Sequence, residues 1–346
     1  MWLRKFLAAI AAAEVTYLVA LNLALQLPVT QTLINQLRPD KFQVSWDRAW
    51  TWYPFRVHAT GISANGQTRT QQWQVDSPSA SASIAVLPLI AKRVWLSNVT
   101  ATDVSYRQRP RLKPDKDYRD LVPFFPEIEG RGIVPAETRP LKMKRPWRLA
   151  VDGIAASGQH RVWIMNFKGA ARGKLKADLQ YESRGGPFSL GNGEFDLTLD
   201  TMYASGDNEI FRRGEVKGTI EFRPFIPREN KNINILKYLL LDARVNIDAN
   251  KLAFINLFAQ NFNDMTIDGR GHLAGRVQLD GGNLLPATDL VVEAGNIIIE
   301  VLGHRIEGEG ALKFAGSSDI EDAVELGVDY HDLEVTHTGD DSPLLA

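Results

Sequence analysis

The spacing of apolar residues changes once along this chain, close to residue 28. Before that point, residues 6–27 form the nearly unbroken apolar run FLAAIAAAEVTYLVALNLALQL. A helix of this length spans roughly 33 Å at 1.5 Å per residue, close to the ~30 Å hydrocarbon core of a bilayer. After it, apolar and polar residues mostly alternate, which is the period of half-buried β-strands. The pattern predicts an N-terminal transmembrane helix followed by a mainly β structure.

Flanking charge predicts the orientation of this helix. Arg4 and Lys5 precede the apolar run, whereas Arg38 and Lys41 lie beyond its other end and weaken the asymmetry. By the positive-inside rule the short head stays in the cytoplasm, and the bulk of the chain lies in the periplasm. We therefore expect a single-pass inner-membrane protein. A cleaved signal peptide is the alternative, although the run is longer than a usual signal and no small-x-small cleavage site follows it.

Alternation is clearest in residues 79–86 (SASASIAV), where serines face one side and alanine, isoleucine and valine face the other. Such a strand has one wet and one dry face. Similar strands return from Trp147 onward, separated by glycine, asparagine and aspartate turn signals every ~10 to 15 residues. We expect an extended, curved antiparallel β-sheet or groove. A closed sandwich would show the same alternation, so both remain open.

Two stretches suggest short helices within the β pattern. Asp248–Phe262 carries Leu252, Ile255, Phe258 and Phe262 at helical spacing, and Asp248 or Asn250 can cap its first turn. An apolar stripe of this kind faces a core, or it plugs or lines an apolar cavity. Asn232–Leu241 reads either as a helix or as a buried strand.

A proline-rich stretch divides the chain. Residues 108–146 contain seven prolines and many charges, which is typical of a long excursion or linker. The expected segments are a cytoplasmic head and transmembrane anchor (1–28), a first β segment (29–107), the excursion (108–146), a main β-groove or sandwich with a helix near 248–262 (147–335), and a loose tail (336–346).

Composition and motifs argue against catalysis. The 346 residues carry a net charge of −1 and no cysteine, which gives no reason to expect nucleic acid and excludes disulfides and thiolate chemistry. There is no phosphate loop and no H-E-x-x-H motif. Residues 269–271 (GRG) and 308–310 (GEG) stand in strand–turn context, and we expect turn glycines there. We expect no enzyme, no cofactor and no metal site.

An amphipathic β-sheet must bury its apolar face on a second sheet, around a helix, or against an apolar ligand. The candidate residues for a lipid groove are Ile84, Val86, Leu197, Leu199, Ile220, Phe258, Ile297 and Ile299. The same residues would serve an ordinary core. Aromatic residues that follow a span lie at the membrane interface or cap the β-core, and here these are Trp46, Trp50, Trp52 and Tyr53.

Four stretches of the chain resemble the AsmA-like proteins of Gram-negative envelopes, a group that includes TamB-related repeating β-groove lipid-transfer proteins. They are the N-terminal anchor, residues 42–62 (FQVSWDRAWTWYPFRVHATGI), residues 73–106 and residues 269–315. The likeness is one of pattern and involves no signature motif. It implies one inner-membrane helix, a periplasmic β-structure with an apolar concave face, and a part in phospholipid movement or envelope maintenance. It implies no catalytic residues.

The residues and the resemblance together predict a membrane-anchored periplasmic protein that binds or guides phospholipid, or another apolar ligand, through a β-groove. The alternative is an envelope scaffold or adaptor that interacts with membrane-protein partners without transferring a ligand. The chain is short beside members of the group that bridge the envelope. That length favours a shuttle, an adaptor or a subunit that stacks on others.

Overall fold

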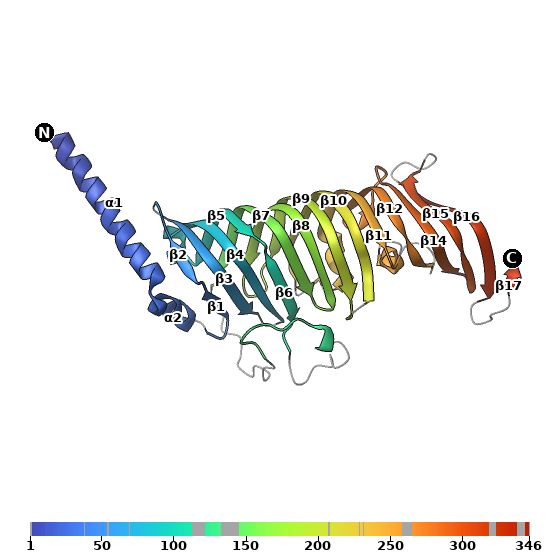
Figure 1. Cartoon of the computed structure of the whole chain (residues 1–346), viewed down its shortest axis with the longest axis horizontal. Coiled ribbons are helices and arrows are strands. Elements are labelled where there is room, and N and C mark those ends of the chain that lie inside the picture. Colours follow the sequence, from blue (N-terminus) through green and yellow to red (C-terminus); the bar gives the residue numbers. More distant parts are fainter. Residues whose placement is uncertain are drawn as a thin grey trace. The chain divides into compact units, whose positions relative to one another are not determined.

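A computed structural model describes residues 2–37, 39–53, 55–68, 70–112, 122–132, 145–206, 208–227, 229–230, 232–257, 265–317, 323–337 and 343–345 (Figure 1). Over these residues the helices are α1 (Trp2–Gln26), α2 (Pro28–Leu37) and α3 (Leu87–Ile90), with 3₁₀ turns η1 (Val122–Phe124), η2 (Asn232–Tyr238) and η3 (Ala253–Leu257). The strands are β1 (Phe42–Ser45), β2 (Arg48–Trp50), β3 (Arg56–Gln67), β4 (Gln71–Ala85), β5 (Arg93–Thr102), β6 (Ser105–Pro110), β7 (Arg148–Ile164), β8 (Phe167–Glu182), β9 (Phe188–Ala204), β10 (Asn208–Phe225), β11 (Leu239–Ala249), β12 (Thr266–Asp280), β13 (Asn283–Leu284), β14 (Asp289–Val301), β15 (His304–Gly316), β16 (Val324–His337) and β17 (Pro343–Leu345).

The mainly β fold class is confirmed. The strands of the described residues are assigned to one mixed sheet of 17 strands. The N-terminal helix α1 is long and apolar enough to cross a membrane, judged by its length and composition. It begins at Trp2, before the apolar run, because Leu3, Arg4 and Lys5 are good helix formers.

The chain folds into two compact units, and the boundary between them falls within β8. The N-terminal unit consists of Met1–Lys168 and Asp178–Arg184, and the C-terminal unit consists of Gly169–Ala177 and Gly185–Ala346. The possible membrane anchor therefore belongs to the N-terminal unit, whereas most of the long strands belong to the C-terminal unit.

In the N-terminal unit, β3 pairs with β1 and β2 along one edge and with β4 along the other. Strand β4 pairs with β5 over one half and with β6 over the other half. These pairings are antiparallel, as expected, but β7 runs parallel to β5 and β6. A parallel pairing needs a long crossover connection, and the proline-rich stretch between β6 and β7 supplies it. The sheet is therefore mixed.

The wet and dry faces expected for β4 are present. Ser81 accepts a hydrogen bond from the Arg56 guanidinium at 2.7 Å. On the alternate positions, Ala80 lies opposite Ala59 of β3 and Ala101 of β5. Small apolar residues thus meet across three strands, while hydroxyl and charged groups meet on the other side.

Side-chain hydrogen bonds tie α1 to the first strands. Asn22 donates to the carbonyl of Thr51 and accepts from its backbone N–H, both at 2.9 Å. Trp46 donates its indole N–H to the carbonyl of Leu25 at 3.0 Å. Because Asn22 has these protein partners, its polar amide in the apolar run is satisfied near the C-terminal end of α1.

A polar cluster holds residues 122–132 against β3 and β6. Arg109 of β6 donates to the carbonyl of Pro126 at 3.1 Å, and Arg131 donates to the side-chain oxygen of Asn65 of β3 at 3.0 Å. Burial lowers the pKa of both guanidinium groups, but arginine remains charged at neutral pH. This part of the proline-rich excursion is therefore packed onto the sheet by buried charge-assisted hydrogen bonds.

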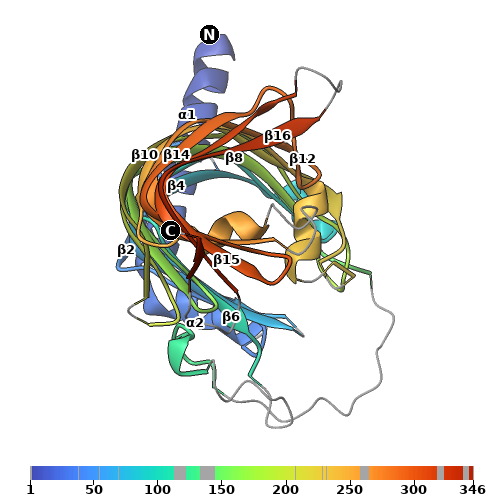
Figure 2. The same cartoon turned by 90° about the vertical axis from the view of Figure 1, so that its right-hand side faces the viewer.

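In the C-terminal unit, β9, β10, β11, β12, β14, β15 and β16 pair in that order, and every pairing is antiparallel. Strand β13 adds a short pairing to β12, and β17 adds one to β16. Seen along the sheet, the strands of this unit are bent, and η3 lies inside their curve (Figure 2).

Several glycines expected in turns lie inside strands. Gly269 belongs to β12, where it pairs with Ile297, and Gly310 belongs to β15, directly after a register shift in the ladder. Gly269 has a φ of 122°, and a Cβ on it would overlap the carbonyl oxygen of Asn296. The turn interpretation was wrong because strands also require a residue without a side chain where two backbones approach closely.

The helix expected over Asp248–Phe262 is also wrong over the described residues. Asp248 and Ala249 are the last residues of β11, opposite His272 and Gly271 of β12. Only Ala253–Leu257 is helical, as the 3₁₀ turn η3. Pairing with β12 satisfies the backbone groups that a helix would otherwise have satisfied, so the strand prevails over local periodicity.

Candidate functional site

Two rows of mainly apolar side chains cross one face of the C-terminal unit. Residues directly opposite each other in antiparallel strands lie on the same face of a sheet. The first row runs from β9 to β16 through Leu199, Gly214, Ile247, Leu273, Val292, Leu312 and Val328. The second row runs through Leu197, Val216, Val245, Gly275, Leu290, Phe314 and Leu326. We call these two rows the apolar lane.

The opposite face of the same strands is charged. Lys217 pairs with Asp196 at 2.7 Å, and Arg276 pairs with Asp242 at 2.6 Å. The hydrogen bond from Arg276 holds the pKa of Asp242 below its ordinary value. These pairs are largely exposed and add little to stability, but they identify the face that meets water. The lane is therefore the dry side of an amphipathic sheet.

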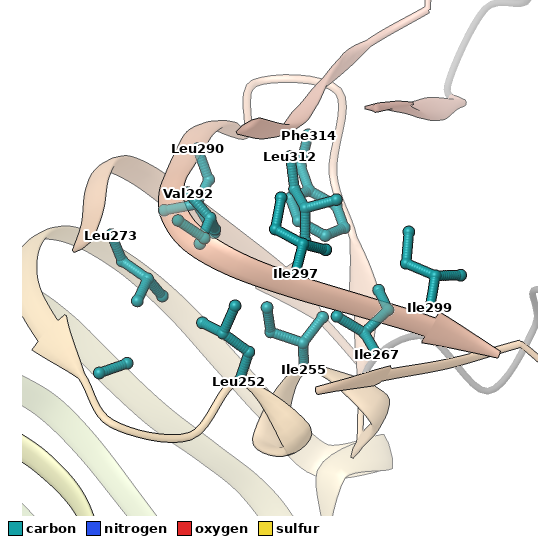
Figure 3. Packing of buried hydrophobic residues seen from close by; sticks show 12 residues of the cluster. Leu252, Ile255, Ile267, Leu273, Leu290, Val292, Ile297, Ile299, Leu312 and Phe314 are labelled. Atoms are coloured by element: carbon teal, nitrogen blue, oxygen red, sulfur yellow. The ribbon is translucent and has the colours of Figure 1, made fainter. Parts of the chain in front are cut away.

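The turn η3 covers the middle of the lane. Leu252 and Ile255 pack in one cluster with Val292 and Leu312 of the sheet (Figure 3). Leu252, Val292 and Leu312 are each 0% exposed. The centre of the lane is thus a closed apolar core with η3 as its cover.

One side chain fastens this cover to the sheet edge. Asn256 donates to the carbonyl of Ile267 at 2.8 Å and accepts from its backbone N–H at 2.7 Å. The backbone N–H of Leu252 donates to the carbonyl of Gly269 at 2.8 Å. The cover is held to β12 by three hydrogen bonds of the described residues.

The ends of the lane are less covered than its centre. Val328, on β16, is 37% exposed, and Leu197 and Leu199, on β9, are half-buried. Apolar surface that continues past the covered core can accept another apolar molecule without first unfolding the core.

Five of the groove candidates predicted from the sequence lie in the C-terminal unit. Leu197 and Leu199 lie on the lane, and Ile220 of β10 lies opposite Leu241 and is half-buried. Ile297 and Ile299 belong to the buried cluster, at 0% and 4% exposed. Substituting them would disrupt the core, so they cannot report on a ligand.

The remaining candidates lie away from the lane. Ile84 is in β4 of the N-terminal unit, opposite Leu96 of β5. Val86 follows β4, directly before α3, and is exposed. Phe258 lies outside the described residues.

The four interface aromatics separate into two pairs. Trp46 is half-buried against α1, and Trp50 stacks on His58 with ring centroids 5.8 Å apart. Trp52 and Tyr53 are 73% and 52% exposed. The structure therefore leaves the second pair accessible and packs the first pair against protein.

No metal-binding cluster is formed within the described part of the chain. Burial, with Glu307 nearby, raises the pKa of Tyr330 to about 12, so this phenol keeps its proton at neutral pH. The C-terminal unit offers an apolar surface on one face, and on its other face His272 lies 2.7 Å from the carboxylate of Asp248.

Most of the lane was missed in the sequence. Its central residues Leu273, Leu290, Val292, Leu312 and Phe314 lie at alternate positions of their strands. That alternation was a usable signal for a dry face. Which residue lies opposite which depends on strand register, and no pattern within a single strand states it.

Comparison with known proteins leaves the family open. No protein-family model matches the chain, and no curated protein sequence matches it. The functional argument therefore depends on the geometry of the lane and of α1.

Proposed function

We propose that this protein is anchored in the inner membrane by α1 and binds or guides phospholipid along the apolar lane, with its β-structure in the periplasm. The observation that carries the proposal is the continuity of the lane across seven strands, past the part that η3 covers. The AsmA-like resemblance of the sequence agrees with this function.

The dimensions and energetics of the lane suit an acyl chain. Six inter-strand spacings of about 4.8 Å give the whole lane a length of about 29 Å, of which the two spacings from β9 to β11, beside the covered centre, give about 10 Å. Each methylene group buried on this part would contribute about 0.8 kcal/mol. A chain lying across the strands would therefore be held by many small contacts and could slide without breaking a specific one.

The proposal is tested by site-specific photo-crosslinking in the full-length protein. A benzophenone amino acid at Leu199 should form a covalent adduct with phospholipid, identified by mass spectrometry after digestion. Thr198 is the matched control, because it is the next residue of β9 and lies on the charged face opposite Glu215. A Leu199 probe that gives no more lipid adduct than the Thr198 probe would remove the lane from lipid binding.

A second candidate is the adaptor function. Val328 leaves apolar surface exposed on β16, at the other end of the lane from Leu199. A protein partner could cover this surface as well as a lipid could. The same photo-crosslinker at Val328 distinguishes them, because a protein adduct shifts the band by the mass of the partner and a lipid adduct does not.

A further inference from the structure

The N-terminal unit exposes large apolar side chains at one end. Leu87 and Ile90, on α3, are 81% and 87% exposed, and Trp52 is 73% exposed. The backbone N–H of Ile84 donates to the carbonyl of Phe55 at 2.8 Å, so the end of β4 lies beside the β2–β3 turn. The exposed residues of α3 and of this turn therefore belong to the same end of the unit. Apolar clusters this exposed mark interaction surfaces.

Helix α1 passes the same end. The rings of Tyr17 and Phe55 are 6.0 Å apart. A hydrocarbon core of ~30 Å needs about 20 helical residues, and counted from Phe6, where the apolar run begins, this length ends near Leu25. Asn22, which is hydrogen-bonded to the backbone of Thr51, lies about one turn before that point. Thr51 and the neighbouring Trp52 are therefore close to the boundary of the membrane that α1 would span, and Phe55, beside Tyr17, lies further towards its core.

Basic residues accompany the apolar ones. Lys92, Arg93, Arg145 and Arg148 line a small pocket immediately after α3. Arg148 is paired with Glu182 at 2.7 Å. Within the described residues, the other three cations form no ion pair. Cations next to exposed apolar side chains are the composition that binds an anionic membrane surface.

We propose that this end of the N-terminal unit, which we call the rim, docks on the leaflet beside α1. The rim consists of Trp52, Tyr53, Phe55, Leu87, Ile90, Lys92, Arg93, Arg145 and Arg148. Its apolar side chains enter the head-group region, and its cations contact the phosphates of anionic lipids. The inference takes α1 as a membrane anchor but does not depend on lipid in the lane.

Fluorescence in lipid nanodiscs tests the docking. The chain has no cysteine, so Ile90→Cys in the full-length protein gives a single site for an environment-sensitive dye. The dye should emit as in an apolar medium and be quenched by spin-labelled phospholipid. Gln71→Cys is the control, because this exposed residue begins β4, about 46 Å along the strand from Ala85 at 3.3 Å per residue, and α3 follows the other end of that strand. Leu87→Cys is the second rim site, in case Ile90→Cys fails to fold. Equal, water-like emission at the rim and control sites would overturn the proposal.

Removing cations from the rim tests its contact with anionic head groups. Each cation at an anionic surface contributes about 1 kcal/mol, or about fivefold, so Arg93→Gln with Arg145→Gln should lower the docked-to-undocked ratio roughly 25-fold in discs containing phosphatidylglycerol. The control pair is Arg161→Gln with Arg172→Gln, two exposed arginines on β7 and β8, which should leave the ratio unchanged. Equal losses in both pairs would show a nonspecific charge effect and refute the head-group contact. Quenching at Ile90→Cys without a lipid adduct at Leu199 would retain the rim and remove only the lane function.

Discussion

At Gly269 the absence of one side chain decides the path of a strand. The residue has a positive φ of 122°, and the backbone of β14 passes beside it at Asn296. An L-residue with a side chain rarely adopts that conformation, and here its Cβ would also meet backbone rather than a movable side chain. The close pairing of β12 with β14 at this position therefore depends on glycine for both reasons.

Gly269→Ala should lower the free energy of unfolding by about 1–3 kcal/mol, the usual cost of forcing a residue into a sparsely populated conformation. Gly295→Ala is the matched control, because a Cβ at Gly295 meets nothing within 4 Å. Its effect should stay within about 0.5 kcal/mol. Urea denaturation of the full-length protein in detergent measures both. Equal stability of the two variants would show that β12 tolerates a side chain at residue 269.

At the scale of elements, η3 determines whether the centre of the lane is core or groove. Leu252 is fully buried between this turn and the sheet, while its neighbour Lys251 is exposed. The turn is short and has few backbone hydrogen bonds of its own, so its position depends on Leu252, Ile255 and Asn256.

Leu252→Ala should cost about 2–5 kcal/mol, because it leaves a cavity between the cover and the sheet. Lys251→Ala should cost less than about 0.5 kcal/mol. Thermal unfolding followed by circular dichroism compares the two variants with the wild type. A loss for Leu252→Ala no larger than that for Lys251→Ala would mean that η3 does not seal the lane.

The elements differ in how well the sequence predicts them. Alternation along single strands, such as residues 79–86, is a local property and was read correctly. The parallel pairing of β7 is not local, since it depends on where the proline-rich crossover returns the chain. The helix predicted over Asp248–Phe262 is wrong for a related reason. Its apolar residues have helical spacing, but at Asp248 and Ala249 the neighbouring strand β12 offers a ladder of hydrogen bonds. Tertiary pairing then outweighs local propensity.

At the scale of the whole molecule, an apolar helix and an amphipathic sheet were both predictable. The helix follows from an unbroken apolar run, and the sheet follows from the alternation of apolar and polar residues. The alignment of dry faces into a lane was not, because register is set between strands. The rim was not predictable either. Leu87–Ile90 reads as an apolar connector, and only the hydrogen bond from Ile84 to Phe55, together with the contact of Phe55 with Tyr17, brings this segment near α1.

The anchor predicts opposite accessibility for the two ends of α1. Arg4 and Lys5 should keep the N-terminal head in the cytoplasm, so a cysteine inserted after Met1 should react with a membrane-impermeant maleimide only after spheroplasts are lysed. Ser157→Cys, at an exposed position of β7, should react in intact spheroplasts. Because the chain has no cysteine of its own, each variant carries one reactive site. The reverse labelling pattern would place the β-structure, lane and rim in the cytoplasm, and loss of the inserted cysteine from the mature protein would show that α1 is a cleaved signal.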